Sequence, residues 1–176
     1  MDYPENYLKS VLFEFHRYKT MGDKTFAQLD KKEIHWRASK NDNSVALIVK
    51  HMVGNMLSRW TNFLIEDGEK PWRNRENEFE NVYGTKKEML SAWEKGWQCL
   101  FDALEAVNAT NFNTIVKIRD EEHTIVQAAN RQLAHYASHV GQIVFVGKMI
   151  KGSDWVSLSI SKGGSVDFNK TMFKKD

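Results

Sequence analysis

The sequence predicts an all-α protein, a four-helix bundle with a small β-hairpin inserted before the last helix. Three observations predict this class. Four segments of roughly 20–25 residues repeat apolar side chains at helical spacing. Only 2 prolines interrupt the 176 residues, so long helices are permitted. There is no strand–helix–strand alternation and no glycine-rich phosphate loop. Four helices that each carry one apolar stripe bury those stripes best against one another.

The first two predicted helices cover residues 5–29 and 45–66. Apolar residues recur at helical spacing from Tyr7 to Phe26 in the first segment. Asn43 or Ser44 offers a side-chain oxygen that can cap the second helix. The inner stripe of this second helix consists of Val45, Ile48, Met52, Met56, Trp60 and Phe63 or Leu64. The following charged stretch, EDGEKPWRNRENEFENVYG, is predicted to be a loop.

The third helix begins at a capping box, since Thr85 and Glu88 have the spacing of that motif. Its core stripe is flanked by a seam of small side chains, which can face either another helix of the bundle or a second copy of the chain: Ala92, Gly96, Cys99 and Ala103. NTIVKIRDEEHTIVQ contains two short β-rich runs around an acidic turn and predicts the hairpin. A fourth helix follows over about 126–151. We expect one domain over residues 1–176, with 152–176 as a C-terminal tail that wraps the surface or frays.

Composition excludes several classes of function. The formal net charge of +2 does not argue for a nucleic-acid partner, and no apolar run approaches the length of a membrane span. The N-terminal stretch MDYPENYLKS lacks the pattern of a signal peptide, so we expect a cytoplasmic protein. The single cysteine, Cys99, excludes an internal disulfide.

His135 and His139 stand four residues apart in RQLAHYASHVGQI. A helix places both imidazoles on one face, with Cβ atoms about 5–6 Å apart. Paired helical histidines of this spacing bind metal in zinc proteins. No acidic residue stands at position 136 or 138, so the pattern is not the HExxH of metalloproteases. The alternative interpretation is that one ring is exposed and the other packs in the core.

His51 lies in the middle of the second predicted helix, close to its apolar stripe. Burying an imidazole unpaired costs about 1–3 kcal/mol, so this ring needs a hydrogen-bond partner or a metal. Gly54 and Ser58 lie one and two turns further on, and their small side chains leave space beside the ring. His51 is therefore either a third metal ligand or a core histidine bonded to a carbonyl or hydroxyl group.

Other reactive side chains fit structural roles better. Cys99 is expected to behave as a small buried apolar side chain, and no nucleophile elbow is present. Three histidines are expected not to bind metal: His16, His35 and His123. Two carboxylates are candidate general bases because they lie on predicted helices: Glu14 and Glu66. Three side chains are candidates to line a pocket: Trp36, Trp72 and Arg73.

Together these motifs resemble those of the DinB-like (DinB/YfiT-type) metal-binding four-helix bundles, in a branch of unknown function. The resemblance covers most of the chain and is carried by SVALIVKHMVGNMLSRW, DGEKPWRNRENEFE, NRQLAHYASHVGQIV and KGSDWVSLSI. In that superfamily three histidines bind one divalent metal ion, and the matching positions are His51, His135 and His139. The resemblance thus implies one divalent ion per chain. Nitrogen-only ligation suits zinc, nickel, iron or copper, and we expect zinc or nickel, with iron as an alternative. The resemblance also implies a homodimer.

Three functions are compatible with these motifs. Three neutral imidazoles leave one coordination position of the metal ion open for water or a thiol. Some members of the DinB-like superfamily, which this sequence resembles, are thiol S-transferases that use bacillithiol, mycothiol or glutathione. The first hypothesis is a metal-dependent thiol S-transferase that joins a low-molecular-weight thiol to a small electrophile. The second is a metal-dependent hydrolase of small molecules, and the third is a non-enzymatic metal-binding or ligand-binding module.

Overall fold

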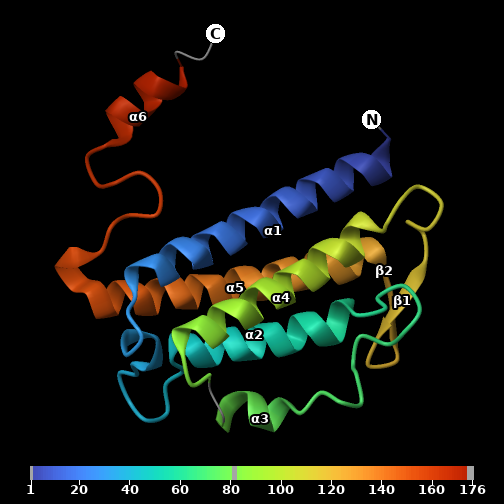
Figure 1. The fold of residues 1–176 in the computed structure, drawn as a ribbon. Coiled ribbons are helices and arrows are strands. Elements are labelled where there is room, and N and C mark those ends of the chain that lie inside the picture. The colour runs from blue at the N-terminus through green and yellow to red at the C-terminus, as the bar shows by residue number, and fades with distance from the viewer. Residues whose placement is uncertain (1, 81–82, 174–176) are drawn as a thin grey trace.

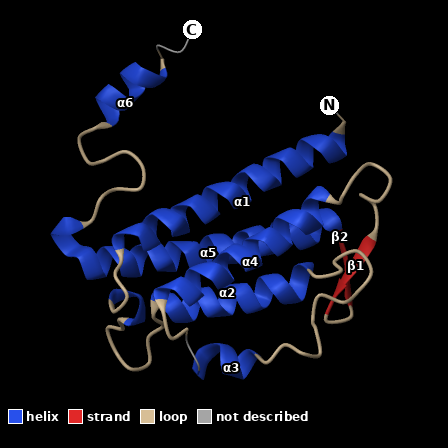
Figure 2. Ribbon diagram, viewed as in Figure 1, coloured by secondary structure: helices blue, strands red, loops and turns tan. Residues whose placement is uncertain are grey.

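Four long helices form the body of the protein in the computed structural model, which describes residues 2–80 and 83–173. They are α1 (Tyr3–Gln28), α2 (Val45–Trp60), α4 (Lys86–Glu105) and α5 (Ile125–Lys151). α2 packs mainly against α4 and α1 against α5, and α2 also contacts α5. The predicted four-helix bundle with a two-stranded hairpin before the last long helix is confirmed (Figures 1 and 2).

The directions in which the four long helices run explain the long connection between α2 and α4. Figure 1 shows that α2 and α4 run in the same direction, whereas α1 and α5 run the opposite way. The chain must therefore return along the length of the bundle between α2 and α4. At 1.5 Å per residue, this length is about 24 Å for a helix such as α2. Residues 61–80 and 83–85 belong to this returning connection.

Side-chain caps fix the start of each long helix. Of the two proposed caps for α2, Ser44 is the one used, because its hydroxyl accepts a hydrogen bond from the Leu47 N–H. The predicted capping box of Thr85 and Glu88 is present at α4. A second capping box, which the sequence analysis did not identify, joins Thr124 and Gln127 at the start of α5. Each cap satisfies N–H groups that have no partner within the helix.

The prediction that the second helix continues to residue 66 is wrong. α2 ends at Trp60, and Asn62 adopts a left-handed conformation with φ of 50° that interrupts the helix. The following chain folds back onto the last turn of α2. The Ser58 hydroxyl donates to the carbonyl oxygen of Gly68 at 2.7 Å, and Arg59 donates to the same carbonyl.

The charged stretch after α2, predicted to be a loop, contains the short helix α3 (Arg75–Glu80). The Asn74 side chain accepts a hydrogen bond from the Asn77 N–H at 3.1 Å, which is the geometry of an N-cap. Acidic residues in the first turn, Glu76 and Glu78, complement the positive end of the helix dipole. α3 lies along the outside of α2 (Figure 1). This short helix carries Glu78.

The hairpin pairs β1 (Ile115–Ile118) with β2 (Glu121–Thr124) in antiparallel register. Its two turn residues, Arg119 and Asp120, have φ of 57° and 61°, as in a type I′ turn. Such turns favour Asn and Gly, but here the Asp67 carboxylate accepts the N–H groups of both turn residues at 2.8 and 2.7 Å. The connection after α2 thus holds the hairpin in place.

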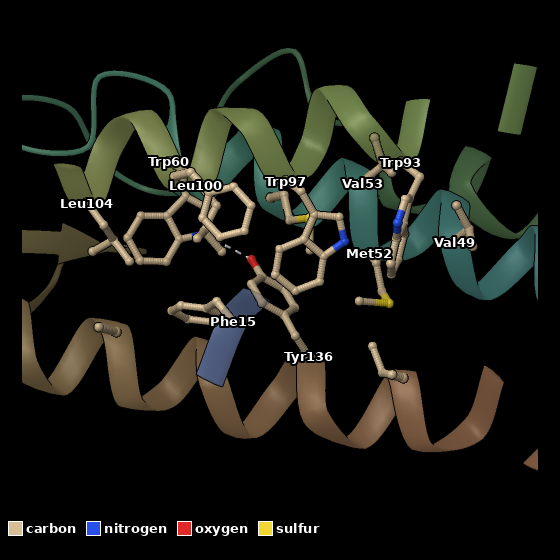
Figure 3. Close-up of a cluster of buried hydrophobic side chains, with 14 of the residues drawn as sticks. Phe15, Val49, Met52, Val53, Trp60, Trp93, Trp97, Leu100, Leu104 and Tyr136 are labelled. Carbon is tan, nitrogen blue, oxygen red and sulfur yellow. Dashed lines mark hydrogen bonds between the residues drawn. The ribbon is translucent and has the colours of Figure 1, made fainter. Parts of the chain in front are cut away.

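An aromatic cluster fills the bundle core (Figure 3). Phe15, Trp60, Trp97 and Tyr136 have at most 2% of their surface exposed. The Tyr136 hydroxyl accepts a hydrogen bond from the Trp60 indole N–H at 3.2 Å and donates to Asn55 at 2.8 Å. Tyr136 points into the core. His135 and His139 lie on the neighbouring face of the same helix, and this face is directed toward α2.

The small-residue seam of α4 lies inside the bundle at Gly96. A methyl group at this position would stand 3.1 Å from the sulfur of Met56 and 3.4 Å from the Cα of Val53, both on α2. Gly96 therefore allows α2 and α4 to approach closely, which is one of the two roles left open for the seam.

Beyond α5, the chain forms a 3₁₀ turn at Gly152–Asp154 and then helix α6 (Ser165–Met172). α6 extends away from the bundle (Figure 1). Several of its apolar side chains are exposed, including Val166 and Phe168. None of the helices within the described part of the chain has the length and apolar character needed to span a membrane.

Candidate metal centre

Three histidines from two helices converge at one point between α2 and α5. His51 comes from α2, and His135 and His139 come from one face of α5, as their spacing predicts. One nitrogen of each ring lies within 4.8 Å of the others. The Nε2 atoms of His135 and His139 are 3.0 Å apart. Within residues 2–80 and 83–173, this is the one cluster of histidine, cysteine and carboxylate groups that could hold a metal ion.

The remaining nitrogen of His51 has an acidic partner. Its Nδ1 lies 2.9 Å from Oε2 of Glu78, and both side chains are buried. Arg73 holds the same carboxylate with two N–H donors, at 2.8 and 3.1 Å. When Nδ1–H donates to Glu78, Nε2 carries a lone pair toward the other two histidines. Metal-binding histidines usually have such a carboxylate partner, which fixes the tautomer and the ring orientation.

His139 is oriented in a similar way by its own helix. Its Nδ1 lies 3.2 Å from Oε1 of Gln142, one turn further along α5. When Nδ1–H donates to this oxygen, the His139 Nε2 lone pair faces the Nε2 of His135. Two ring nitrogens 3.0 Å apart must share either a proton or a cation. Nitrogens bound to one ion at about 2.1 Å stand roughly 3–4 Å apart. The three ring nitrogens can therefore bind one divalent metal ion if the two that lie farthest apart move about 1 Å closer together.

Burial keeps the histidines of α5 in the form that binds metals. Desolvation, with the neighbouring His139 and His51 rings, lowers the pKa of His135 to about 4. The pKa of His139 is also lowered, mainly by burial. Both rings are therefore neutral near pH 7. Burial alone would raise the pKa of Glu78, but hydrogen bonds from His51 and Arg73 outweigh it and lower the pKa. Glu78 thus remains a carboxylate.

These shifts predict that the metal-free protein loses stability as the pH falls from 6.5 toward 4. The unfolded chain takes up a proton at His135 near the ordinary pKa of 6.5, whereas the folded chain resists protonation until about pH 4. Protonation therefore favours the unfolded state throughout this interval. The measurement is the urea midpoint between pH 4 and 7.5 in the presence of a chelator. His135→Gln is expected to flatten the profile, and an equal slope in both proteins would contradict the assignment.

A cavity of about 210 Å³ opens beside His51 and His135. Arg73 is part of its wall, as the sequence analysis suggested for this residue. The two tryptophans proposed with it lie elsewhere. Trp36 lines a separate hollow next to Gln142, and Trp72 is 58% exposed and lines none of the described cavities.

Other candidate residues lie away from the centre. The Glu14 carboxylate pairs with Arg17 and that of Glu66 with Lys70, and neither candidate base belongs to the histidine cluster. Burial raises the pKa of the Cys99 thiol, which makes it a poor nucleophile. The histidines expected not to bind metal are outside the cluster. His16 stacks on Phe101, with ring centroids 4.0 Å apart.

Glu78 and Gln142 are the main residues that the sequence analysis missed. A signal for α3 was present, because Asn74 followed by Glu76 and Glu78 is typical of a helix start. That pattern did not indicate contact with His51. Gln142 follows His139 by three residues, which on a helix places the two side chains on the same face.

The fold and the site define a helical-bundle protein with three histidines that could hold a metal ion. A family model described as "Protein of unknown function (DUF1572)" matches residues 2–164, and the chain belongs to this family. No curated protein and no solved structure matches the chain significantly.

Proposed function

We propose that His51, His135 and His139 bind one divalent metal ion and that the protein is a metal-dependent thiol S-transferase acting on small electrophiles. The observation that carries the proposal is the convergence of three buried or half-buried imidazoles with no fourth histidine, cysteine or carboxylate among the described residues of the cluster. Structural zinc sites are usually closed by four protein ligands, whereas catalytic sites keep an open position.

The protein's own groups prepare the ligands. Glu78 and Gln142 hold the Nδ1 atoms of His51 and His139, so the other nitrogens face inward. Nitrogen ligands suit zinc, nickel or iron, and we propose zinc or nickel as the native ion. When bound, a divalent ion supplies Lewis acidity at its open position, where a thiol ionises without a protein base.

The surrounding carboxylates support a thiol as the nucleophile. Both oxygens of Glu78 accept hydrogen bonds from His51 and Arg73, and the low pKa of this carboxyl makes it a weak proton acceptor. No carboxylate from residues 2–80 and 83–173 is part of the cavity wall. A reaction at this site therefore depends on a nucleophile that ionises readily, and a thiol does so more readily than water. The likeness to DinB-like proteins, which include thiol S-transferases, supports the same choice.

Metal analysis tests the first half of the proposal. Protein purified without an affinity tag is expected to contain close to one divalent ion per chain. Alanine variants of His51, His135 and His139 should each lose most of it, because two remaining ligands bind weakly. His16→Ala is the matched control, since His16 lies outside the cluster. Full occupancy in the double variant H135A/H139A would overturn the assignment.

An adduct assay tests the second half. Metal-loaded protein is incubated with an activated aryl chloride and, separately, bacillithiol, glutathione, mycothiol or cysteine. The thiol sulfur bonds to the aryl carbon, chloride leaves with its bonding electrons, and the thiol proton passes to solvent. Adduct formation should exceed the uncatalysed rate for at least one thiol and disappear in His51→Ala. Metal-dependent cleavage of activated esters or amides without thiol transfer would assign a hydrolase instead. Inactivity in both assays would indicate a binding module.

A further inference from the structure

Five arginines from separate parts of the chain line the cavity beside the histidines. They come from α2, from the connection and α3, from the hairpin turn and from α5: Arg59, Arg73, Arg75, Arg119 and Arg131. Among the described residues, no aspartate or glutamate lines this wall. Guanidinium groups repel one another, so a cluster of this kind in one small cavity requires anionic partners.

The protein supplies only part of this negative charge. Three carboxylates that do not line the cavity pair with four of the guanidinium groups at 2.8–3.5 Å: Glu78 with Arg73, Glu69 with Arg59 and Arg119, and Glu121 with Arg131. Within the described part of the chain, Arg75 has no ion pair. Five guanidinium groups therefore face three carboxylates. A divalent ion at the adjacent histidines would increase this positive surplus.

Two buried amide side chains complete the wall with unused hydrogen-bonding groups. Gln132 is 3% exposed, and its buried carbonyl oxygen Oε1 has no hydrogen-bond partner among the described residues. An amide oxygen only accepts hydrogen bonds, so this side chain serves an anion when the amide flips and turns its N–H donors into the cavity. Asn55 is 6% exposed and uses its carbonyl oxygen to accept the Tyr136 hydroxyl, which leaves its amide N–H donors available. A buried amide without a partner costs free energy unless a ligand or water satisfies it. Both amides belong to the cavity wall.

The wall is held in place before any ligand arrives. The Asp67 carboxylate fixes the backbone of Arg119 and Asp120, and the Arg119 guanidinium is bound to Glu69 at 3.0 Å. On the other side, Arg131 donates to the ring of His123 at 3.0 Å. Donors that are already positioned lose little entropy when an anion binds.

We propose that this cavity binds the carboxylate or phosphate group of the substrate, so that the reacting end of the same molecule reaches the three-histidine site. This inference deepens the proposed function and rests on it for the role of the anion as part of the substrate. The volume of about 210 Å³ suits an oxyanion with a few attached atoms. Pockets for whole drug-sized ligands are typically about 300–1,000 Å³.

The test is calorimetric titration of the full-length protein with inorganic phosphate and, separately, with acetate, in low-chloride buffer. Both titrations are made on chelator-treated protein and on metal-loaded protein, because an anion can also bind a metal directly. The chelator-treated protein is expected to bind at least one of the two anions at one site. A preference for phosphate or for acetate then identifies the anionic group of the substrate.

Arg75→Gln and Arg131→Gln should each weaken this binding about tenfold, the effect of losing one charge-assisted hydrogen bond. Gln132→Glu should abolish it, because a carboxylate in the wall occupies the site. Arg17→Gln is the matched control, since Arg17 is an exposed arginine with one acidic partner on α1; its change should stay below about twofold. If Arg17→Gln weakened anion binding as much as Arg75→Gln and Arg131→Gln, the effect would reflect only the net charge of the protein, and the proposal would be overturned.

Metal content separates this inference from the proposed function. The arginine variants are expected to retain the metal, whereas the histidine variants lose it. A protein that holds metal but binds neither anion contradicts the anion site alone. A protein that binds an anion in the cavity but no metal contradicts the three-histidine centre alone.

Discussion

Gly54→Ala is expected to lower the affinity for a divalent metal about 10- to 100-fold, the range typical for loss of a partner that orients a ligand. Gly54 lies on α2 where the Glu78 carboxylate approaches, and a methyl group there would collide with this carboxylate. Glu78 would have to move away from His51, leaving the ring free to rotate. Competition with a chromophoric chelator measures the affinity.

Two further variants make this prediction specific. Glu78→Gln keeps the size of the side chain but removes its charge, so we expect a loss of the same order. Gly141→Ala is the matched glycine control, because it lies on the metal-binding helix and a methyl group there meets nothing within 4 Å. It should leave metal affinity unchanged and stabilise α5 by about 0.5–1 kcal/mol. Equal affinity losses in Gly54→Ala and Gly141→Ala would show that the Glu78 contact has no role.

Trp97→Ala is expected to lower the free energy of unfolding by about 3–5 kcal/mol, the usual cost of removing a large core side chain. Trp97 is fully buried at the centre of the aromatic cluster (Figure 3). Its ring centroid lies 5.3 Å from that of Trp93, 5.9 Å from Tyr136 and 6.2 Å from Phe15. Urea denaturation of chelator-treated protein measures the change without a contribution from the metal.

Trp97→Phe should cost less than half as much. The phenyl ring keeps most of the aromatic contacts, and the substitution removes a buried indole N–H that has no partner among the described residues. Trp72→Ala, at a position that is 58% exposed, should change stability by less than about 0.5 kcal/mol. If Trp97→Phe were as destabilising as Trp97→Ala, the shape of the indole and not its apolar area would dominate the core.

Periodicity predicted the four long helices because each must bury one apolar stripe, and this requirement is visible locally in the sequence. The three-histidine cluster could be predicted for a related reason. His135 and His139 are neighbours through helix geometry alone, and His51 required only that two predicted helices pack together. Gly54 was expected to leave space beside the His51 ring. The structure shows that the Glu78 carboxylate occupies this space.

The partners of these residues could not be predicted, because they depend on where connections fold. Glu78 reaches His51 across 27 positions of sequence, from a segment whose charges resemble those of a solvated loop. Arg119 reaches the cavity from the hairpin turn, which the sequence does not place relative to α2. Arg131 stands one turn before His135 on α5, but its pairing with Glu121 of the hairpin depends on the same placement. The end of α2 also depended on tertiary contacts, since Ser58 and Arg59 bind the returning chain at Gly68.

Because Glu78 lies on α3, the residues that stabilise the fold and the residues that surround the metal site belong to different segments of the chain. The tryptophan core belongs to the long helices, whereas Glu78, Arg73 and Arg75 belong to the connection between α2 and α4. A library confined to residues 66–80 could therefore alter ion preference or substrate charge without repacking the core. For directed evolution of a new specificity, this connection is the segment to randomise, and the four helices are the scaffold to leave unchanged.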